Sequence, residues 1–518
     1  MSESNDSRPD IYIGLVGAAG TDLKSVLREL KSQLLVVGYT VEHIKVSELI
    51  KAAVGIPDLA DENERIKHHM KAGDLIRSNS ANGGGVAALA MQAIVSTRGK
   101  TTKGKSRAFV IDSFKHPDEI ELFDRVYVRN YYTMSVHLPR ITRQKNLEIQ
   151  IAKDQHQPPD PEMAMLAKQI ITDDEKSQGD KAQNVRDAFP KADFFVNGKS
   201  DLPQQIKRFV EIVFAEPFVT PTLDEYGMFM AKGAGYRSAD LSRQVGATII
   251  DQNGSLIGTG CNEAPYPGGG FYVDGHSDGI DDNRDYVKQI DPNAAEIQST
   301  FIEIVGILRE AGHIGDTKKD KRGDVELVDD LLQGDLKHLA RNARIRSLIE
   351  FGRVVHAEMH AICDAAAAGK AVRDSSLYCT TFPCHLCAKH IMASGIAEVV
   401  YIEPYPKSLT AKLYSDEIEF ADERRETGNN TGQRRLVFRP FHGVSPILFQ
   451  RAFRQKKRKD SRGILALWDP TMAEPTDASR TVERPRLETT AVNSVVRVLK
   501  KAKAKYDSWS EESIDEEG

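Results

Sequence analysis

The sequence His356-Ala357-Glu358, followed by Pro383-Cys384-His385-Leu386-Cys387, decides the fold of the C-terminal half of the chain. At this chain's composition, Pro-Cys-x-x-Cys is expected by chance only about 0.002 times. Two cysteines three residues apart lie on one face of a helix, so both thiols project toward one point. The preceding proline is typical of a helix start, where the peptide dipoles favour thiolate over thiol.

In this order, the two motifs resemble the signature of zinc-dependent deaminases. We expect His356, Cys384 and Cys387 to bind Zn²⁺ and to leave the fourth tetrahedral position to water, whose pKa zinc lowers toward ~7. We predict that Glu358 moves protons and does not bind the metal. Two alternatives stay open: a redox-active Cys-x-x-Cys pair, and a structural zinc site completed by Cys379 or His385.

Four blocks of sequence resemble deoxycytidylate deaminases: residues 243–247, 258–265, 353–362 and 380–391. The resemblance implies a cytidine-deaminase-like α/β/α sandwich, hydrolysis at C4 of a deoxycytidine nucleotide, and Asn262 at the sugar. The chain departs from the family at His360, where relatives usually carry Asn. Arg243 and Lys407 are candidate contacts for the outer phosphates, and dCTP and dCMP are both open as substrates.

The N-terminal half alternates apolar strands with helical patterns, which predicts a parallel α/β sheet. Strands are expected at 11–16, 36–41 and 107–112, with a helix from Leu23 to about Leu35. Between the first strand and this helix lies a turn of small residues that is suited to bind phosphate through its amides. A helix-capping role for Asp112 and a plain glycine-rich turn are the alternatives. We predict a nucleotide site, for ATP, GTP or another nucleotide with Mg²⁺, at Gly17, Ala18, Ala19, Gly20, Thr21 and Asp112.

The turn departs from the usual phosphate-binding motif because Leu23 stands where that motif has lysine. Residues 70–77 and 110–119 nevertheless resemble P-loop nucleotide-kinase-like domains. Such a domain fused to a deaminase resembles the bacterial anti-phage dCTP deaminases, and residues 401–408 fit the same family. The resemblance implies that the enzyme depletes dCTP as antiviral defence and that it forms a homo-oligomer. It also implies that the enzyme is kept inactive until a phage infects the cell, and that in some members an inhibitory small RNA keeps it inactive.

Prolines at 217 and 221 mark a boundary between two predicted domains. We expect a P-loop kinase-like domain over 1–220, a deaminase-like domain over 221–455 with a long helical insertion at about 265–345, and a C-terminal tail over 456–518.

Composition excludes several classes of protein. The 518 residues include 70 Lys and Arg against 75 Asp and Glu, for a net charge of -5, so a generally basic nucleic-acid coat is excluded. Mean hydropathy is -0.41 and charges interrupt every apolar stretch, so we expect no membrane span. The polar N-terminus and the five cysteines, four of which lie within 25 residues, predict a cytoplasmic protein with reduced thiols.

Three other functions are compatible with the motifs. A deaminase acting on RNA or single-stranded DNA needs a basic groove with aromatic side chains, but aromatics are only 7% of the residues. A nucleotide-sensing regulatory protein with a structural zinc has no need of Glu358. An active kinase in the N-terminal domain would make the chain bifunctional, but the turn lacks the expected lysine.

Overall fold

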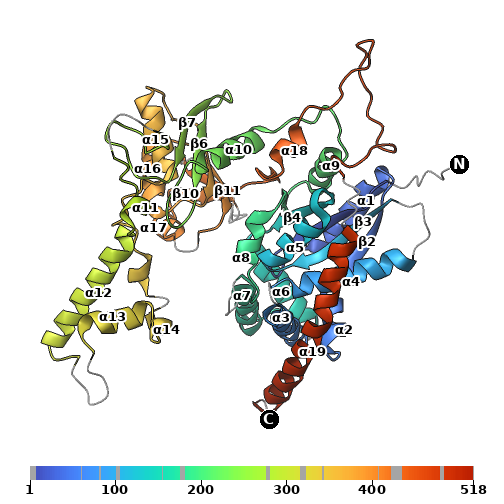
Figure 1. Ribbon diagram of the computed structural model, residues 1–518, viewed down its shortest axis with the longest axis horizontal. Coiled ribbons are helices and arrows are strands. Elements are labelled where there is room, and N and C mark those ends of the chain that lie inside the picture. Colours follow the sequence, from blue (N-terminus) through green and yellow to red (C-terminus); the bar gives the residue numbers. More distant parts are fainter. Residues whose placement is uncertain are drawn as a thin grey trace. The chain divides into compact units, whose positions relative to one another are not determined.

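The computed structural model describes residues 8–516, except 60, 81–82, 101–105, 155, 176–180, 276–280, 315–321, 341–342, 406–407, 422–433 and 479–483. These residues form two compact units, which are described separately (Figure 1). The first unit contains the residues up to Phe229 and those from Pro440 onward. The second runs from Met230 to Arg439, except that 420–429 are grouped with the first.

The first unit is built on a sheet with the strand order β12-β5-β4-β1-β3-β2. Its strands are β1 (Ile11–Val16), β2 (Thr40–Lys45), β3 (Arg107–Phe114), β4 (Tyr131–His137), β5 (Phe194–Asn197) and β12 (Gly443–Val444). All the pairs from β2 to β5 are parallel, and β12 pairs antiparallel with β5. The predicted parallel α/β arrangement is therefore confirmed, whereas the P-loop fold remains a prediction.

The expected strand at 36–41 is wrong in its position. Helix α1 (Leu23–Val36) continues to Val36, and β2 begins only at Thr40. The turn between them contains Gly38, whose φ of 74° suits glycine. The β-branched pair Val36-Val37 suggested a strand, but Leu34 and Val37 are buried as part of the helical stripe that covers the sheet.

Both faces of this sheet are covered by helices. In β1, Tyr12 and Val16 belong to the core beneath α2–α5 and α19, whereas Ile11, Ile13 and Leu15 belong to the core beneath α1 and α9. This alternation is the period of two that a central strand buried on both faces requires. The other helices of the unit are α2 (Val46–Val54), α3 (Glu62–Ser78), α4 (Gly85–Lys100), α5 (Pro117–Tyr127), α6 (Arg140–Asp154), α7 (Pro161–Glu175), α8 (Val185–Ala188), α9 (Leu202–Val213), α18 (Phe449–Phe453) and α19 (Arg484–Glu516), with short 3₁₀ turns at Val128–Asn130 and Phe189–Lys191.

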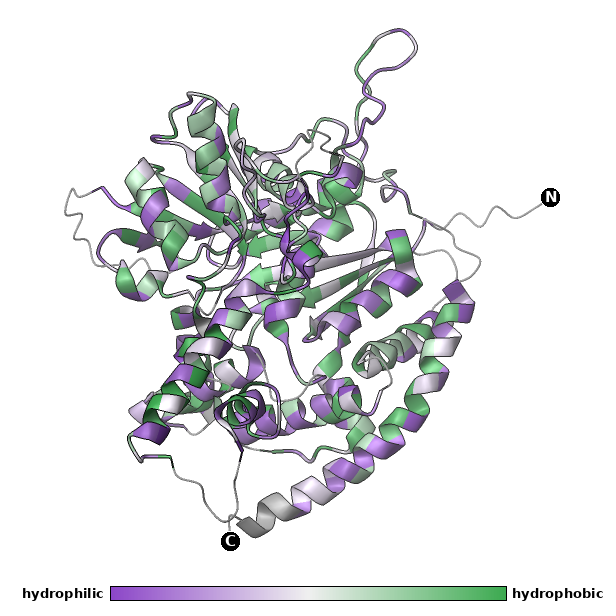
Figure 2. Cartoon of the chain, turned by 60° about the vertical axis from the view of Figure 1, so that its left-hand side comes forward, coloured by the Kyte–Doolittle hydropathy of each residue, from purple (hydrophilic) through white to green (hydrophobic). Residues whose placement is uncertain are grey.

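The C-terminal segment expected as a tail contains the long helix α19. Ala491, Val495, Ala502 and Tyr506 are buried on one side of it and join the core of the first unit. The hydropathy colouring of Figure 2 shows apolar and polar residues alternating along this helix. Residues 440–455, which the sequence assigned to the deaminase-like domain, also lie in the first unit.

The second unit is built on a sheet with the order β10-β11-β9-β8-β6-β7. Here β6 pairs antiparallel with β7 and β8, and β8 pairs in parallel with β9, so this sheet is mixed. The strands are β6 (Gly246–Ile250), β7 (Leu256–Cys261), β8 (Ser376–Thr381), β9 (Glu398–Glu403), β10 (Ile418–Phe420) and β11 (Leu436–Pro440). The helices outside the insertion are α15 (Ala357–Ala367), α16 (His385–Ser394), α17 (Thr410–Leu413) and α10 (Leu223–Gly235), which begins in the first unit and ends in the second.

Helix α15 lies unusually close to β7, because that strand carries glycines where the two elements meet. A Cβ atom on Gly258 would lie 2.4 Å from the carbonyl oxygen of Ala361, and one on Gly260 would lie 2.1 Å from that of Ala357. Only glycine permits this approach. The close packing fixes the start of α15 on the sheet.

The expected insertion is largely helical where it is described. Its helices are α11 (Asp285–Lys288), α12 (Pro292–Glu310), α13 (Asp324–Leu332) and α14 (Lys337–Ala340), followed by a 3₁₀ turn at Arg344–Ser347. Val305, Val328 and Leu332 form a small core between α12 and α13. Among the described residues, no helix is both long and apolar enough to cross a bilayer.

Candidate active site

His356 lies directly before the first residue of α15. The residue before it, Val355, forms an antiparallel bridge with Glu263, just after β7, with N–H···O distances of 3.0 and 3.3 Å. The carboxylate of Glu263 is buried and accepts from the backbone N–H of Ala239 at 2.7 Å. The imidazole is therefore held at the point where strand, helix and loop meet.

The two cysteines occupy the first turn of α16. Cys384 is the N-cap residue, and its Sγ accepts from the backbone N–H of Cys387 at 3.4 Å. Both cysteines are buried. Since the N-termini of α15 and α16 lie at His356 and Cys384, both helix dipoles favour negative charge on the thiols.

These three side chains have the spacing of a tetrahedral zinc site. The Nδ1 atom of His356 lies 3.3 Å from Sγ of Cys384 and 3.5 Å from Sγ of Cys387. With ordinary Zn–S and Zn–N bond lengths, a tetrahedral S···N edge is about 3.6 Å. In the described part of the chain, no other group of three or more His, Cys, Asp or Glu side chains is close enough to hold a metal ion, and Cys379 and His385 are not members of this one.

The charge state of the cluster suits a metal. Hydrogen bonds with Cys387 and then with His356 lower the pKa of Cys384 to about 4. The bond with Cys384 raises the pKa of His356 to about 9. The thiolate form of Cys384 is thus already favoured. A cation bound between Cys384 and His356 takes the place of the proton that these two side chains share, and His356 is then neutral.

Glu358 lies in the first turn of α15 and is only 4% exposed. Burial is the largest cause that raises the pKa of its carboxyl group. A carboxyl group with a raised pKa accepts and returns a proton near neutral pH more readily than an exposed one.

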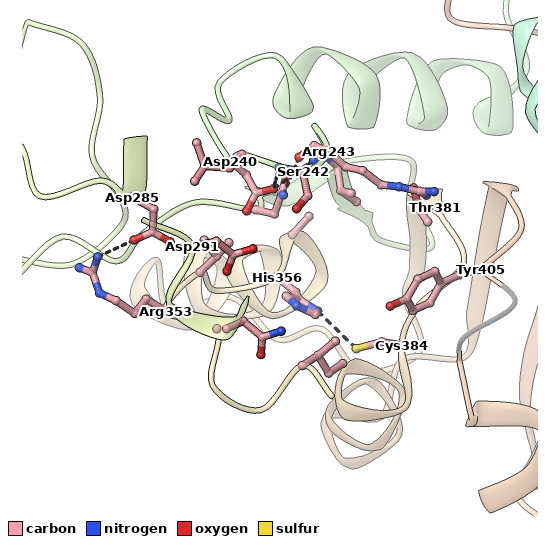
Figure 3. A pocket seen from close by; sticks show the side chains of 18 of the residues that line it. Asp240, Ser242, Arg243, Asp285, Asp291, Arg353, His356, Thr381, Cys384 and Tyr405 are labelled. Atoms are coloured by element: carbon pink, nitrogen blue, oxygen red, sulfur yellow. Dashed lines mark hydrogen bonds and ion pairs between the residues drawn. The ribbon is translucent and has the colours of Figure 1, made fainter. Parts of the chain in front are cut away.

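A cavity of about 250 Å³ opens beside these residues (Figure 3). Its size suits a nucleoside or a nucleotide base and sugar more than a long groove. Its lining residues include His356, Glu358, Thr381, Phe382, Cys384 and Tyr405 from the core, Asp240, Arg243 and Asn262 from the segments around β6 and β7, and Asp285, Asp291, Asn293 and Arg353.

The structure brings Asn262 and Arg243 to this cavity. Asn262 is buried, its Oδ1 accepts from the N–H of Val245 at 2.7 Å, and its Nδ2 donates to the carbonyl of Arg243 at 2.8 Å. The amide therefore fixes the loop that carries Arg243. The Arg243 side chain is half-exposed and lies 3.5 Å from Glu403. Lys407 lies outside the described residues.

His360, the departure from the related sequences, has a structural contact. Its Nδ1 lies 2.8 Å from the carbonyl oxygen of Cys261, and its ring packs edge-on against Phe271 with centroids 4.3 Å apart. It joins α15 to the end of β7 and to the first part of the insertion.

Sequence reasoning did not identify Asp240, Asp285, Asp291, Asn293, Arg353 or Tyr405 as cavity residues. Of these residues, Arg353 is the one that the sequence could have suggested, because it lies three residues before His356. The others depend on how loops and the insertion fold back onto the core.

In the predicted nucleotide site of the first unit, most of the polar groups form hydrogen bonds with other groups of the chain. The N–H of Ala19 donates to the buried carboxylate of Asp174 at 2.6 Å, and Lys115 Nζ donates to Gly17 O and to Asp174, each at 2.9 Å. At Gly20, a Cβ atom would lie 2.3 Å from the carbonyl oxygen of Arg143. The carboxylate Oδ2 of Asp112 lies 3.4 Å from Nε2 of His43. The remaining turn residues, Ala18 and Thr21, are joined by a Thr21 N–H···O=C Ala18 bond of 3.0 Å.

The family comparison agrees with this site. Residues 221–403 match the family model described as the cytidine and deoxycytidylate deaminase zinc-binding region. The chain thus carries a deaminase-type domain in its C-terminal half.

Curated relatives are similar over a short stretch. The deoxycytidylate deaminases of Enterobacteria phages T2 and T4 are each 44% identical over 54 residues, 10% of this chain and 29% and 28% of theirs. ComE operon protein 2 of Bacillus subtilis (strain 168) is 40% identical over 53 residues, 10% of this chain and 28% of its own. The chain thus matches less than a third of the length of each of these relatives.

Solved structures with similarity include the dCMP deaminase of cyanophage S-TIM5. Its apo form is 17% identical, covers 43% of this chain and 99% of its own, and has a TM-score of 0.21. The complex of the same enzyme with dCMP and dUMP is 18% identical, covers 38% of this chain and 93% of its own, and has a TM-score of 0.21.

Proposed function

We propose that the second unit is a zinc-dependent hydrolase that converts free deoxycytidine nucleotides, dCTP and dCMP, to deoxyuridine nucleotides. The observation that carries this proposal is the set His356, Cys384 and Cys387 at tetrahedral spacing, with the buried acid Glu358 at the same cavity. A structural zinc site usually has four protein ligands and no adjacent acid.

The reaction adds water to C4 of cytosine and releases ammonia. When bound, zinc supplies the Lewis acidity that makes a water molecule acidic near neutral pH. Glu358 takes a proton from that water and delivers it to N3, and it then carries the second proton to the amino group. The C4–O bond forms and the C4–N bond breaks, so atoms and charges balance.

Two features favour a free nucleotide as substrate. The cavity is small, and one of its sides carries the cationic Arg243, whose guanidinium lies 3.5 Å from the carboxylate of Glu403 at a solvent-exposed site. The T2 and T4 relatives are named deoxycytidylate deaminases. We assign Arg243 to the 5′-phosphate, Asn262 to the sugar and to the loop that holds Arg243, and Lys407 to the outer phosphates.

For the whole chain we propose a cytoplasmic, oligomeric antiviral enzyme that depletes dCTP. The first unit would then be a P-loop kinase-like regulatory domain that responds to a nucleotide or, as in some relatives by resemblance, to a small RNA. The contacts of Ala19 and Lys115 with Asp174 favour regulation over catalysis in this unit, because they already engage the groups that would meet a phosphate.

The test is to incubate zinc-loaded protein with dCTP, dCMP, CTP, deoxycytidine and a cytosine-containing single strand, and to measure the uracil products by mass spectrometry. We expect turnover of the two deoxynucleotides. Turnover of the strand alone would establish the polynucleotide deaminase instead. The absence of turnover with all five substrates, both before and after ribonuclease treatment, would contradict the proposal.

A further inference from the structure

The insertion contributes a wall to the cavity beside the predicted zinc ligands. Asp285 of α11 and Asp291, Pro292 and Asn293 at the start of α12 line it, together with Arg353. Figure 3 shows Asp285, Asp291 and Arg353 on one side of His356, and Arg243, Thr381 and Tyr405 on the other.

The two sides differ in charge. Arg353, on the insertion side, is already neutralised, because its guanidinium donates to the carboxylate of Asp285 and to the carbonyl of Asn283. Asp291 is exposed and forms no ion pair within the described part of the chain. The insertion side therefore carries a net negative charge at Asp291, whereas the opposite side carries the half-exposed cation Arg243 with the carboxylate of Glu403 3.5 Å away.

The start of α12 does not offset this charge. A free helix N-terminus attracts phosphate through its unpaired N–H groups. Here Pro292 has no N–H, and the N–H of Ala294 donates to Oδ1 of Asp291 at 3.2 Å. The helix thus presents a carboxylate, and not a row of donors, to the cavity.

Asn293 holds the same wall in place. Its Nδ2 donates to the carbonyl of Leu348 at 2.9 Å, whereas its Oδ1 is buried and accepts no hydrogen bond. The Nδ2 bond ties the start of α12 to the segment that precedes Arg353, whereas the Oδ1 atom has almost no surface that a ligand could contact.

We propose that this insertion wall selects free nucleotides over polynucleotides by rejecting a phosphate on the 3′ side of the sugar. The inference rests on the proposed function. The 5′ and 3′ substituents leave opposite ends of the furanose ring, so a 5′-phosphate at Arg243 directs the 3′ substituent toward Asp291 and Asn293. A free nucleotide places an uncharged 3′-hydroxyl there, which Asp291 does not repel. A nucleotide within a strand places an anion there, which Asp291 repels.

The test compares deamination of dCMP with that of deoxycytidine 3′,5′-bisphosphate, with kcat/KM measured for each by mass spectrometry. We expect the wild type to prefer dCMP at least about a hundredfold. Asp291→Asn should reduce that preference about tenfold, as expected for removing one unit of charge at short range. Asn is an equally good N-cap residue, so α12 should remain folded.

The matched control is Asp335→Asn, which removes the same charge from an exposed residue of the insertion that does not line the cavity. It should leave the preference unchanged. The inference is overturned if the wild type deaminates both compounds equally, or if Asp291→Asn and Asp335→Asn give the same ratio. Failure of the proposed function is a different result, since the wild type would then not deaminate dCMP at all.

Discussion

At the scale of single residues, the chemistry depends on two short segments. His356 and Glu358 are separated by one residue, and Cys384 and Cys387 by one helical turn, so local geometry brings each pair to one place. Glu358, Cys384 and Cys387 are all buried, so solvent has little access to the acid or to the two thiols.

The first prediction concerns the ligand assignment. Cys384→Ser should lose bound zinc and reduce deamination at least about 100-fold, because hydroxyl is a poor zinc ligand and the N-cap thiolate is lost. Zinc content by mass spectrometry and turnover of dCMP check it. Cys363→Ser alters an exposed cysteine of the same domain and should change neither quantity. Wild-type zinc content in Cys384→Ser would refute the assignment.

At the scale of elements, the site depends on how α15 and α16 are seated on the second sheet. Gly260 of β7 permits α15 to approach until a Cβ atom would lie 2.1 Å from the carbonyl oxygen of Ala357. Since α15 begins at Ala357, this contact controls where His356 and Glu358 lie.

A second prediction follows for Gly260→Ala. The added methyl group should push α15 away and reduce the free energy of unfolding of the second unit by about 1–3 kcal/mol, with loss of deamination. Thermal unfolding and dCMP turnover measure the two effects. Gly233→Ala is the matched control, because a Cβ atom there would meet nothing within 4 Å. That change should be neutral or stabilise α10 by up to about 1 kcal/mol. An unaltered Gly260→Ala protein would disprove the close-packing argument.

The elements also show what the sequence could predict. The grouping of His356, Cys384 and Cys387, and the position of Glu358 beside them, could be predicted because each pair is local. The parallel sheet could be predicted because central strands such as β1 are continuous apolar runs, whereas the polar strand β2 was misplaced. Helix α19 was not, because its buried residues, such as Ala491 and Tyr506, are separated by many charged ones. The cavity wall that contains Asp285 and Asp291 forms because the insertion folds back onto the core. No local sequence pattern predicts that arrangement.

At the scale of the whole molecule, the chain combines a deaminase-type unit with a separate α/β unit. The second unit holds the predicted chemistry, and the first holds buried ionisable groups whose titration we expect to affect stability. Asp193, beside β5, accepts from the N–H of Thr133 at 2.8 Å, and burial raises its pKa to about 7.

The third prediction is a pH dependence of stability. Because the folded-state pKa of Asp193 exceeds the usual value of 3.8, the folded state binds this proton more tightly than the unfolded state. This contribution is fully present below pH ~4 and is lost as pH rises through about 7. Asp193→Asn should therefore raise the free energy of unfolding of the first unit by about 1–3 kcal/mol at pH 8 and much less at pH 4.

Denaturant unfolding at the two pH values measures the effect. Asp201→Asn, at the N-cap of α9, is a control that keeps a capping residue and should show no comparable pH dependence. A gain for Asp193→Asn that is equal at pH 4 and pH 8 would contradict the assignment.

The most direct test of the central claim is deamination by Glu358→Ala at equal zinc loading. Zinc content and conversion of dCMP and dCTP to uracil nucleotides are measured side by side in the wild type, in Glu358→Ala and in Glu310→Ala, an exposed acid of α12. We predict that all three bind one zinc ion, and that only Glu358→Ala loses activity, by at least about 10³-fold. Full turnover by zinc-loaded Glu358→Ala would contradict the proposed function.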